Sequence, residues 1–412
     1  MASVRVAKLR ATTVEWGSLY PWHFGGSIPS TGPVIGLDRM AGRSPFGLDP
    51  LRLVTEGVAT NPNMVVCGSP GNGKSAFVKQ LLWNLVGSFG YRFVVTDVKG
   101  EYRSLAAALG APILVLRPGG PTRVNPLHDP DGRLEFSAAL ASLCLDRSLD
   151  ALERAALAAA VRALPDRPVI GDLLGVLRDM PATVCDDLVM GRDEALAGTQ
   201  ALRFGLGELL NGSIAGMFDG ASNVEPSTSK VGFVVDVSGC GTDDRVLRFA
   251  MLAGQRAVSQ MLASSTRHTL QVNDEGWRVA STVEGTRWMQ HSFKLGRGQA
   301  IANILVVHRF AEIGAQADGV TGEIAQRLVS DADLHVMFRQ GDRADADDSV
   351  ERLRLPEAIR DALSQLSARR CLVHLRGRLA MLDVVLSRRM LALADTNQAV
   401  RAEPAETPEN HA

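Results

Sequence analysis

The stretch VVCGSPGNGKSAFVKQLL, residues 65–82, decides the fold of this chain. It sets Gly68, Gly73, Lys74 and Ser75 in the G-x-x-x-x-G-K-[ST] spacing that cradles nucleotide phosphates. The glycines let the backbone turn tightly and direct successive N–H groups at phosphate oxygens, and a following helix adds its positive N-terminus. A short apolar run before the loop and helical spacing behind it predict the strand–loop–helix context that this motif requires.

Within the loop, each residue type has a distinct expected role. Lys74 is expected to bridge the β- and γ-phosphates, and the Ser75 hydroxyl to ligate Mg²⁺. ATP and Mg²⁺ are therefore the expected cofactors. The expected nucleotide-binding residues are Gly68, Ser69, Pro70, Gly71, Asn72, Gly73, Lys74, Ser75 and Ala76.

A second motif, HTLQVNDEGW at residues 268–277, is an apolar strand that ends in two acids. We expect Asp274 to hold Mg²⁺, as the strand-end Asp does in phosphate-loop NTPases. Glu275 beside it is the expected general base for the attacking water. This pair favours an ATPase that acts on water over small-metabolite kinases and GTPases.

Composition describes an ordinary globular chain. Of its 412 residues 46% are hydrophobic and 22% charged, and the formal net charge is −1, so no overall basic charge indicates nucleic acid. Five cysteines are scattered singly, a pattern that suits a reducing compartment rather than a disulfide or zinc framework. No run approaches the roughly 18 apolar residues that a membrane span needs.

Strand and helix signals alternate along much of the chain, which predicts an α/β fold with a mostly parallel sheet covered by helices on both faces. Residues 129–224 are Ala- and Leu-rich with helical period, which predicts an all-helical insertion. The expected organisation is a lead-in over 1–55, a nucleotide-binding core over 56–128 and 225–395, the insertion over 129–224, and a disordered tail over 396–412.

Five segments together resemble one family. They are GSPGNGKS (68–75), TDVKGEY (96–102), RVNPL (123–127), GMFDG (216–220) and NDEGW (273–277). Their order and spacing, over about residues 20–390, are similar to those of the HerA/FtsK superfamily of ring-forming motors, and most similar to the VirB-type motor ATPases of type IV secretion and conjugation. The first and last motifs occur in many families, whereas the middle three are specific in combination.

The resemblance implies a RecA-like P-loop NTPase and further site residues. The strand ANILVVH, ending at His308, should lie between the phosphate-loop and Asp274 strands and carry a polar sensor, where many relatives have Gln. Because rings of this superfamily hydrolyse ATP between subunits, Arg297 and Arg339 are the candidate arginine fingers. Lys99 and Glu101 are expected near the nucleotide or a subunit contact.

The function that the resemblance implies is an ATP-hydrolysing motor that powers type IV secretion or conjugal DNA transfer. The expected partners are further copies of the chain, most simply in a hexamer, channel membrane proteins, and a DNA or protein substrate. The lack of an intrinsic transmembrane segment favours the soluble motor branch over coupling proteins, and a cytoplasmic location, peripheral at the inner face of the membrane. A translocase acting directly on DNA, and a scaffold that binds ATP without hydrolysing it, remain alternatives.

Overall fold

The computed structural model describes residues 28–125, 127–128, 130, 132–212, 214–223, 229–241, 243–262, 267–275, 290, 293–294, 296, 298–312, 327 and 329–394. The predicted disordered tail over 396–412 lies outside the described residues, as does the start of the lead-in.

One 11-stranded sheet organises the molecule, in the order β2-β1-β11-β10-β9-β3-β8-β7-β4-β6-β5. From β9 to β5 all neighbouring strands pair in parallel, and from β9 to β2 they pair antiparallel. The strands are β1 Val34–Asp38, β2 Ser44–Gly47, β3 Met64–Cys67, β4 Arg92–Asp97, β5 Ile113–Val115, β6 Gly232–Asp236, β7 Thr269–Asp274, β8 Ile301–Val307, β9 Leu334–Met337, β10 Arg370–Leu375 and β11 Arg378–Val384.

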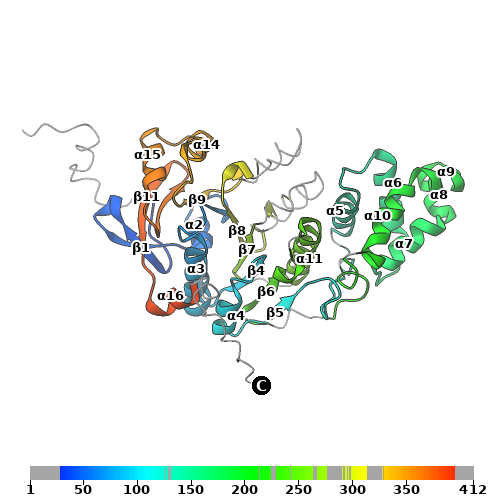
Figure 1. Cartoon of the computed structure of the whole chain (residues 1–412), viewed down its shortest axis with the longest axis horizontal. Helices are drawn as coiled ribbons and strands as arrows, with labels where there is room; N and C mark the ends of the chain where they lie inside the picture. The colour runs from blue at the N-terminus through cyan, green and yellow to red at the C-terminus, as the bar shows by residue number, and fades with distance from the viewer. Residues whose placement is uncertain are drawn as a thin grey trace, which may run out of the picture.

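The helices flank this sheet and form a lobe beside it (Figure 1). They are α2 Pro50–Thr55, α3 Lys74–Phe89, α4 Arg103–Leu109, α5 Arg133–Leu145, α6 Ala151–Arg162, α7 Ile170–Asp179, α8 Ala182–Leu188, α9 Arg192–Gly198, α10 Gln200–Asn211, α11 Asp244–Leu262, α14 Arg343–Leu353, α15 Ala358–Gln365 and α16 Arg388–Ala394.

The central strands are covered on both faces, as their continuous apolar runs predict. In β3, Val65 and Cys67 contribute to one hydrophobic core, and Met64 and Val66 to the other. This alternation follows from the two-residue side-chain period of a strand. The α3 helix packs into the second core, which fixes the phosphate loop between two buried elements.

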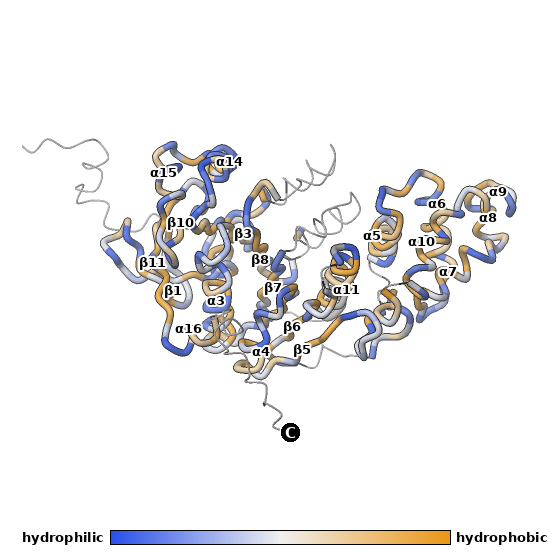
Figure 2. The backbone as a smooth tube through the Cα atoms, in the orientation of Figure 1, coloured by the Kyte–Doolittle hydropathy of each residue, from blue (hydrophilic) through white to orange (hydrophobic). Residues whose placement is uncertain are grey.

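Residues 133–211, which we call the helical lobe, contain helices α5 to α10 and no strand among the residues described. Figure 1 shows α6 to α10 grouped at one end, with α5 and α11 between them and the sheet. Figure 2 shows hydrophobic and hydrophilic stretches alternating along these helices, the pattern of helices that bury one side.

The RVNPL and GMFDG motifs meet at the base of the helical lobe. Arg123 pairs with Asp219 at 2.8 Å, and the Val124 N–H donates to the Met217 carbonyl at 3.0 Å. Asn125 donates through its side chain to the carbonyl of Pro168 at 2.9 Å. The two motifs are thus bonded to each other where the chain enters and leaves the helical lobe. This contact gives both motifs a structural role.

Residues 34–38 and 44–47 of the expected lead-in belong to the core sheet. Strand β1 pairs antiparallel with β11, and β2 extends the edge beyond it. This pairing was not predicted, because pairing with a strand near the other end of the chain cannot be read from local periodicity. Strands β10 and β11 form an antiparallel hairpin that joins β1 to the rest of the sheet.

No helix among the described residues combines the length and apolarity needed to cross a bilayer.

The start of α6 offers a stability test within the helical lobe. Asp150 and Glu153 form a capping box, and Arg147 grips the Glu153 carboxylate through two bonds of 2.7 Å. We predict that Glu153→Ala lowers the free energy of unfolding by about 2–3 kcal/mol, since it removes a cap and charge-assisted hydrogen bonds. Urea unfolding followed by circular dichroism measures this, with Glu135→Ala, an exposed acid in the first turn of α5, as the control.

The same group predicts a pH dependence. Hydrogen bonding from Arg147 is the main cause that lowers the pKa of Glu153 below its ordinary 4.5. The ion pair therefore stabilises the fold fully above pH 4.5 and loses this effect as the pH falls through the folded-state pKa. The stability difference between wild type and Glu153→Gln should shrink in that range. A difference that stays constant down to pH 2 would contradict this assignment.

Candidate nucleotide site

The candidate site lies where parallel strands β3, β8, β7 and β4 end at one edge of the sheet. The strand that ends at His308 lies between the phosphate-loop strand and the Asp274 strand, as the family resemblance implied. The pairing of β8 with β3 and β7 continues just past the strand ends. The Gly68 N–H donates to the His308 carbonyl at 3.3 Å, and the Glu275 N–H donates to the Val306 carbonyl at 3.2 Å.

The phosphate loop is held by its neighbours as well as by its own turn. Gly68 has φ 143°, and a β-carbon there would lie 2.6 Å from Cβ of Phe338, so only glycine fits. The Ser69 N–H donates to the Arg339 carbonyl at 2.9 Å, and the Asn72 side chain donates to the Ser69 carbonyl at 3.2 Å. The segment after β9 thus fixes where the loop begins.

Lys74 and His308 are in direct contact. The Lys74 ammonium lies 3.1 Å from Nδ1 of His308 and also donates to the carbonyls of Gly68 and Ser69. An ammonium has only donors, so Nδ1 accepts and a neutral His308 carries its proton on Nε2. Nε2 lies 3.5 Å from Oε1 of Glu275, which places the imidazole between the two groups.

The two acids of the NDEGW motif sit deep in this edge. Asp274 and Glu275 are only 6% and 5% exposed. Burial raises the pKa of Asp274 to about 7, with the negative charges of Glu101, Asp97 and Glu275 adding to the rise and Lys99 opposing it. Glu275 has a left-handed backbone, φ 56°, a strained geometry of the kind that clusters at functional sites.

Lys99 provides the nearest countercharge for the candidate base. Its ammonium lies 2.5 Å from Oε1 of Glu275. Burial alone would lower the pKa of Lys99, but the ion pair with Glu275 outweighs it and raises this pKa. The contacts Lys99–Glu275, Glu275–His308 and His308–Lys74 form a continuous chain across three strand ends.

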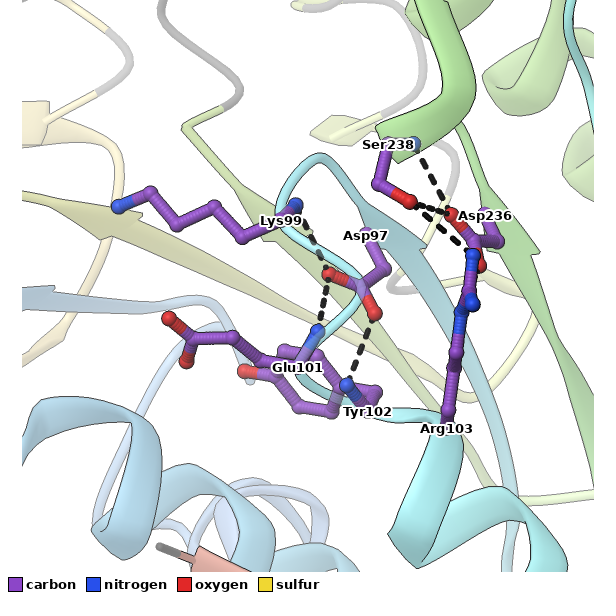
Figure 3. A network of polar contacts seen from close by, with 7 residues as sticks. All are labelled: Asp97, Lys99, Glu101, Tyr102, Arg103, Asp236 and Ser238. Atoms are coloured by element: carbon purple, nitrogen blue, oxygen red, sulfur yellow. Dashed lines mark hydrogen bonds and ion pairs between the residues drawn. The ribbon is translucent and has the colours of Figure 1, made fainter. Parts of the chain in front are cut away.

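Figure 3 shows what gives the DVKGEY loop its shape. The buried Asp97 carboxylate accepts hydrogen bonds from the N–H groups of Lys99 and Glu101, both at 3.2 Å, and of Tyr102 at 2.8 Å. Gly100 supplies a left-handed turn at φ 73°. Asp97 therefore acts as the scaffold of the loop, while Lys99 and Glu101 project from it into the wall of the cleft.

A neighbouring network anchors the far side of the same loop (Figure 3). Arg103, at the start of α4, donates to the Asp236 carboxylate at 2.5 Å, and Ser238 donates to it through its N–H at 2.9 Å and its hydroxyl at 2.6 Å. Burial opposes ionisation of Asp236, but these bonds outweigh it and lower its pKa. The loop is thus tied to β6 as well as to β4.

These elements enclose a cleft of about 510 Å³. It is lined by Pro70, Gly71, Gly73, Lys74, Ser75, Ala76, Lys99, Glu101, Asp274, His308, Arg369, Leu386, Leu391 and Ala394. Part of the lining is therefore the phosphate loop and the strand ends, and another part comes from Leu386 before α16 and from Leu391 and Ala394 within it.

The donor set of the cleft fits a magnesium ion. The Ser75 hydroxyl and the Asp274 carboxylate line the same space. Mg²⁺ prefers oxygen ligands and is usually held by one or two protein groups together with water and substrate phosphates. Two oxygen donors beside a phosphate loop are such an arrangement.

Neither candidate arginine finger is placed in the cleft by the described residues. Arg339 is exposed two residues after β9, and its carbonyl accepts from the Ser69 N–H of the phosphate loop, but its side chain does not line the cleft. Arg297 lies outside the described residues. Sequence reasoning missed Arg369 and the α16 wall, because neither belongs to a recognisable motif.

Comparison with known proteins agrees with this geometry. A family model described as the central domain of the helicase HerA matches residues 40–154. No curated protein sequence matches the chain.

Solved structures share its architecture over most of their length. VirB4 of Thermoanaerobacter pseudethanolicus superposes with a TM-score of 0.74 and 20% identity, covering 89% of this chain and 100% of that one. The unbound conjugative coupling protein TrwBΔN70 gives 0.59 and 14%, covering 87% and 90%. TrwB in complex with ADP and Mg²⁺ gives 0.57 and 14%, covering 94% and 97%.

At these identities the structural likeness shows a shared fold, and the mostly parallel P-loop NTPase sheet predicted from the sequence is confirmed. The HerA central-domain model over residues 40–154 agrees with the resemblance that the five motifs indicated, and the chain shares the fold of VirB4 and TrwB.

Proposed function

We propose that this chain is an ATP-hydrolysing motor of a type IV secretion or conjugal DNA transfer apparatus. The main support is that Lys74 and His308 both line the cleft of the phosphate loop and contact each other, while His308 also contacts the candidate base Glu275. The similar folds of VirB4 and of TrwB, which has been seen with an ATP analogue and with ADP and Mg²⁺, support it.

In the proposed reaction, the N–H groups of the phosphate loop and Lys74 hold the β- and γ-phosphates. Glu275 accepts the proton of the attacking water, and His308 orients that water or the γ-phosphate. Ser75 and Asp274 hold Mg²⁺, which neutralises phosphate charge when it is bound. Lys99 keeps the Glu275 carboxylate in place at the strand edge until the water is present.

We further propose that the active form is a ring, most simply a hexamer, with each site completed by an arginine from the neighbouring subunit. Arg339 supports this, because it is an exposed arginine one residue beyond Phe338, the side chain that packs on the phosphate loop. Arg297 remains the second candidate. The ring is proposed to work in the cytoplasm, docked at the inner face of the membrane on channel proteins, and to move DNA or protein.

A direct DNA translocase is the second candidate, and the match of residues 40–154 to the HerA central domain favours it. The two functions share one active site, so the rate of hydrolysis with and without DNA separates them. The motor proposal predicts that double- or single-stranded DNA changes the ATPase rate of the purified chain by less than about twofold. Stimulation of tenfold or more would favour the translocase.

Replacing active-site groups should separate binding from hydrolysis. We predict that Glu275→Gln lowers the ATPase rate at least about a hundredfold, as expected for loss of a general base, while ATP affinity changes little. Lys74→Ala should weaken binding itself. Phosphate-release kinetics and equilibrium binding measure the two effects, with Glu351→Gln, an exposed acid in α14, as the matched control. Equal hydrolysis by wild type and Glu275→Gln would instead support the non-hydrolysing scaffold.

Subunit mixing tests whether an arginine acts between chains. Arg339→Ala and Glu275→Gln should each be inactive alone, since a finger contributes about 10³-fold or more. Mixed assemblies contain interfaces that combine an intact Glu275 from one chain with an intact Arg339 from the other, so activity should partly return. The same mixing with Arg297→Ala identifies which arginine is the finger. Mixed rings that form but stay inactive with both variants would contradict an intersubunit site.

A further inference from the structure

Arg369 is a cleft residue to which no motif assigns a role. It lies between α15 and β10 with a left-handed backbone, φ 63°. Its N–H donates to the Asn72 carbonyl at 3.1 Å, and its own carbonyl accepts from the Val384 N–H at 2.9 Å. The side chain therefore starts from a point that is fixed against the phosphate loop on one side and the β10–β11 hairpin on the other.

The aliphatic part of the Arg369 side chain lies against Gly73, the last residue before the nucleotide-binding helix α3. A β-carbon on Gly73 would lie 3.5 Å from both Cα and Cγ of Arg369. Gly73 immediately precedes α3, whose N-terminal N–H groups face anions in this fold. Arg369 is thus a neighbour of the phosphate cradle in the same chain.

Arg369 and its sequence neighbour Arg370 differ in their ion pairing. Arg370 is paired with Asp383 at 2.8 Å, whereas within the described part of the chain no ion pair involves Arg369, whose side chain is exposed and lines the cleft. A guanidinium presents a planar set of donors that matches phosphate oxygens. Arg369 can therefore bind an anion in the cleft without first breaking an ion pair such as the one that Arg370 makes.

We propose that Arg369 binds the phosphates of the nucleotide held in its own chain, as a second cation beside Lys74. This rests on the proposed nucleotide-binding function and adds a residue to it. Unlike a finger, Arg369 acts within one subunit, so it contributes to binding before any ring assembles.

Equilibrium binding of a fluorescent, non-hydrolysable ATP analogue with Mg²⁺, measured by anisotropy at monomer concentrations, tests this. Arg369→Asn should raise the dissociation constant about tenfold, as for one charge-assisted hydrogen bond. Asn is chosen because it tolerates the left-handed backbone. The control is Arg376→Asn, which changes another exposed arginine with positive φ, 49°, at the opposite end of β10, and should bind like wild type.

Arg369→Lys should recover most of the affinity, because a phosphate accepts hydrogen bonds from an ammonium as well. Equal losses for the Lys and Asn variants would overturn a phosphate contact, since the charge would then be irrelevant. Wild-type affinity in Arg369→Asn, or an equal loss in Arg376→Asn, would also overturn it. These outcomes leave the motor proposal intact. The expected loss of affinity in Arg369→Asn, together with no hydrolysis by wild type, would contradict the motor proposal alone.

Discussion

The parallel pairing of β3 with β8, and of β8 with β7, is the constraint on which the site depends. In this register Cys67 lies opposite Val307, and Asp274 lies opposite Val306. The residues that follow these strands therefore emerge side by side at one edge. A shift of one residue in either pair would turn every side chain to the other face and separate Lys74, His308 and Glu275.

The electrostatics of this edge follow from burial. Asp97, Asp274 and Glu275 are all nearly inaccessible, and carboxylates in that position are costly unless they are paired. The Asp97 carboxylate accepts hydrogen bonds from backbone N–H groups, and the Glu275 carboxylate pairs with Lys99. Burial raises the pKa of Asp274 to about 7, and a cation bound beside it would favour its charged form.

Much of this arrangement could be predicted from the sequence because it is local. The phosphate loop and the acidic strand end follow from motifs and strand patterns, whereas the place of the His308 strand was implied by the family resemblance. The role of Asp97 in shaping its loop was not predicted, because the sequence alone does not distinguish a buried aspartate that binds loop N–H groups from an exposed one. Arg369 and the joining of β1 to β11 depend on contacts between distant segments, which no periodicity records.

A structure determined with Mg²⁺ and a non-hydrolysable ATP analogue would test the central claim most directly. The account predicts phosphates cradled by residues 68–75, the γ-phosphate between Lys74 and His308, Glu275 facing the position of the attacking water, and an arginine of an adjacent subunit reaching the same phosphate. Nucleotide bound elsewhere, or a site completed within one chain with no neighbouring subunit against it, would contradict it.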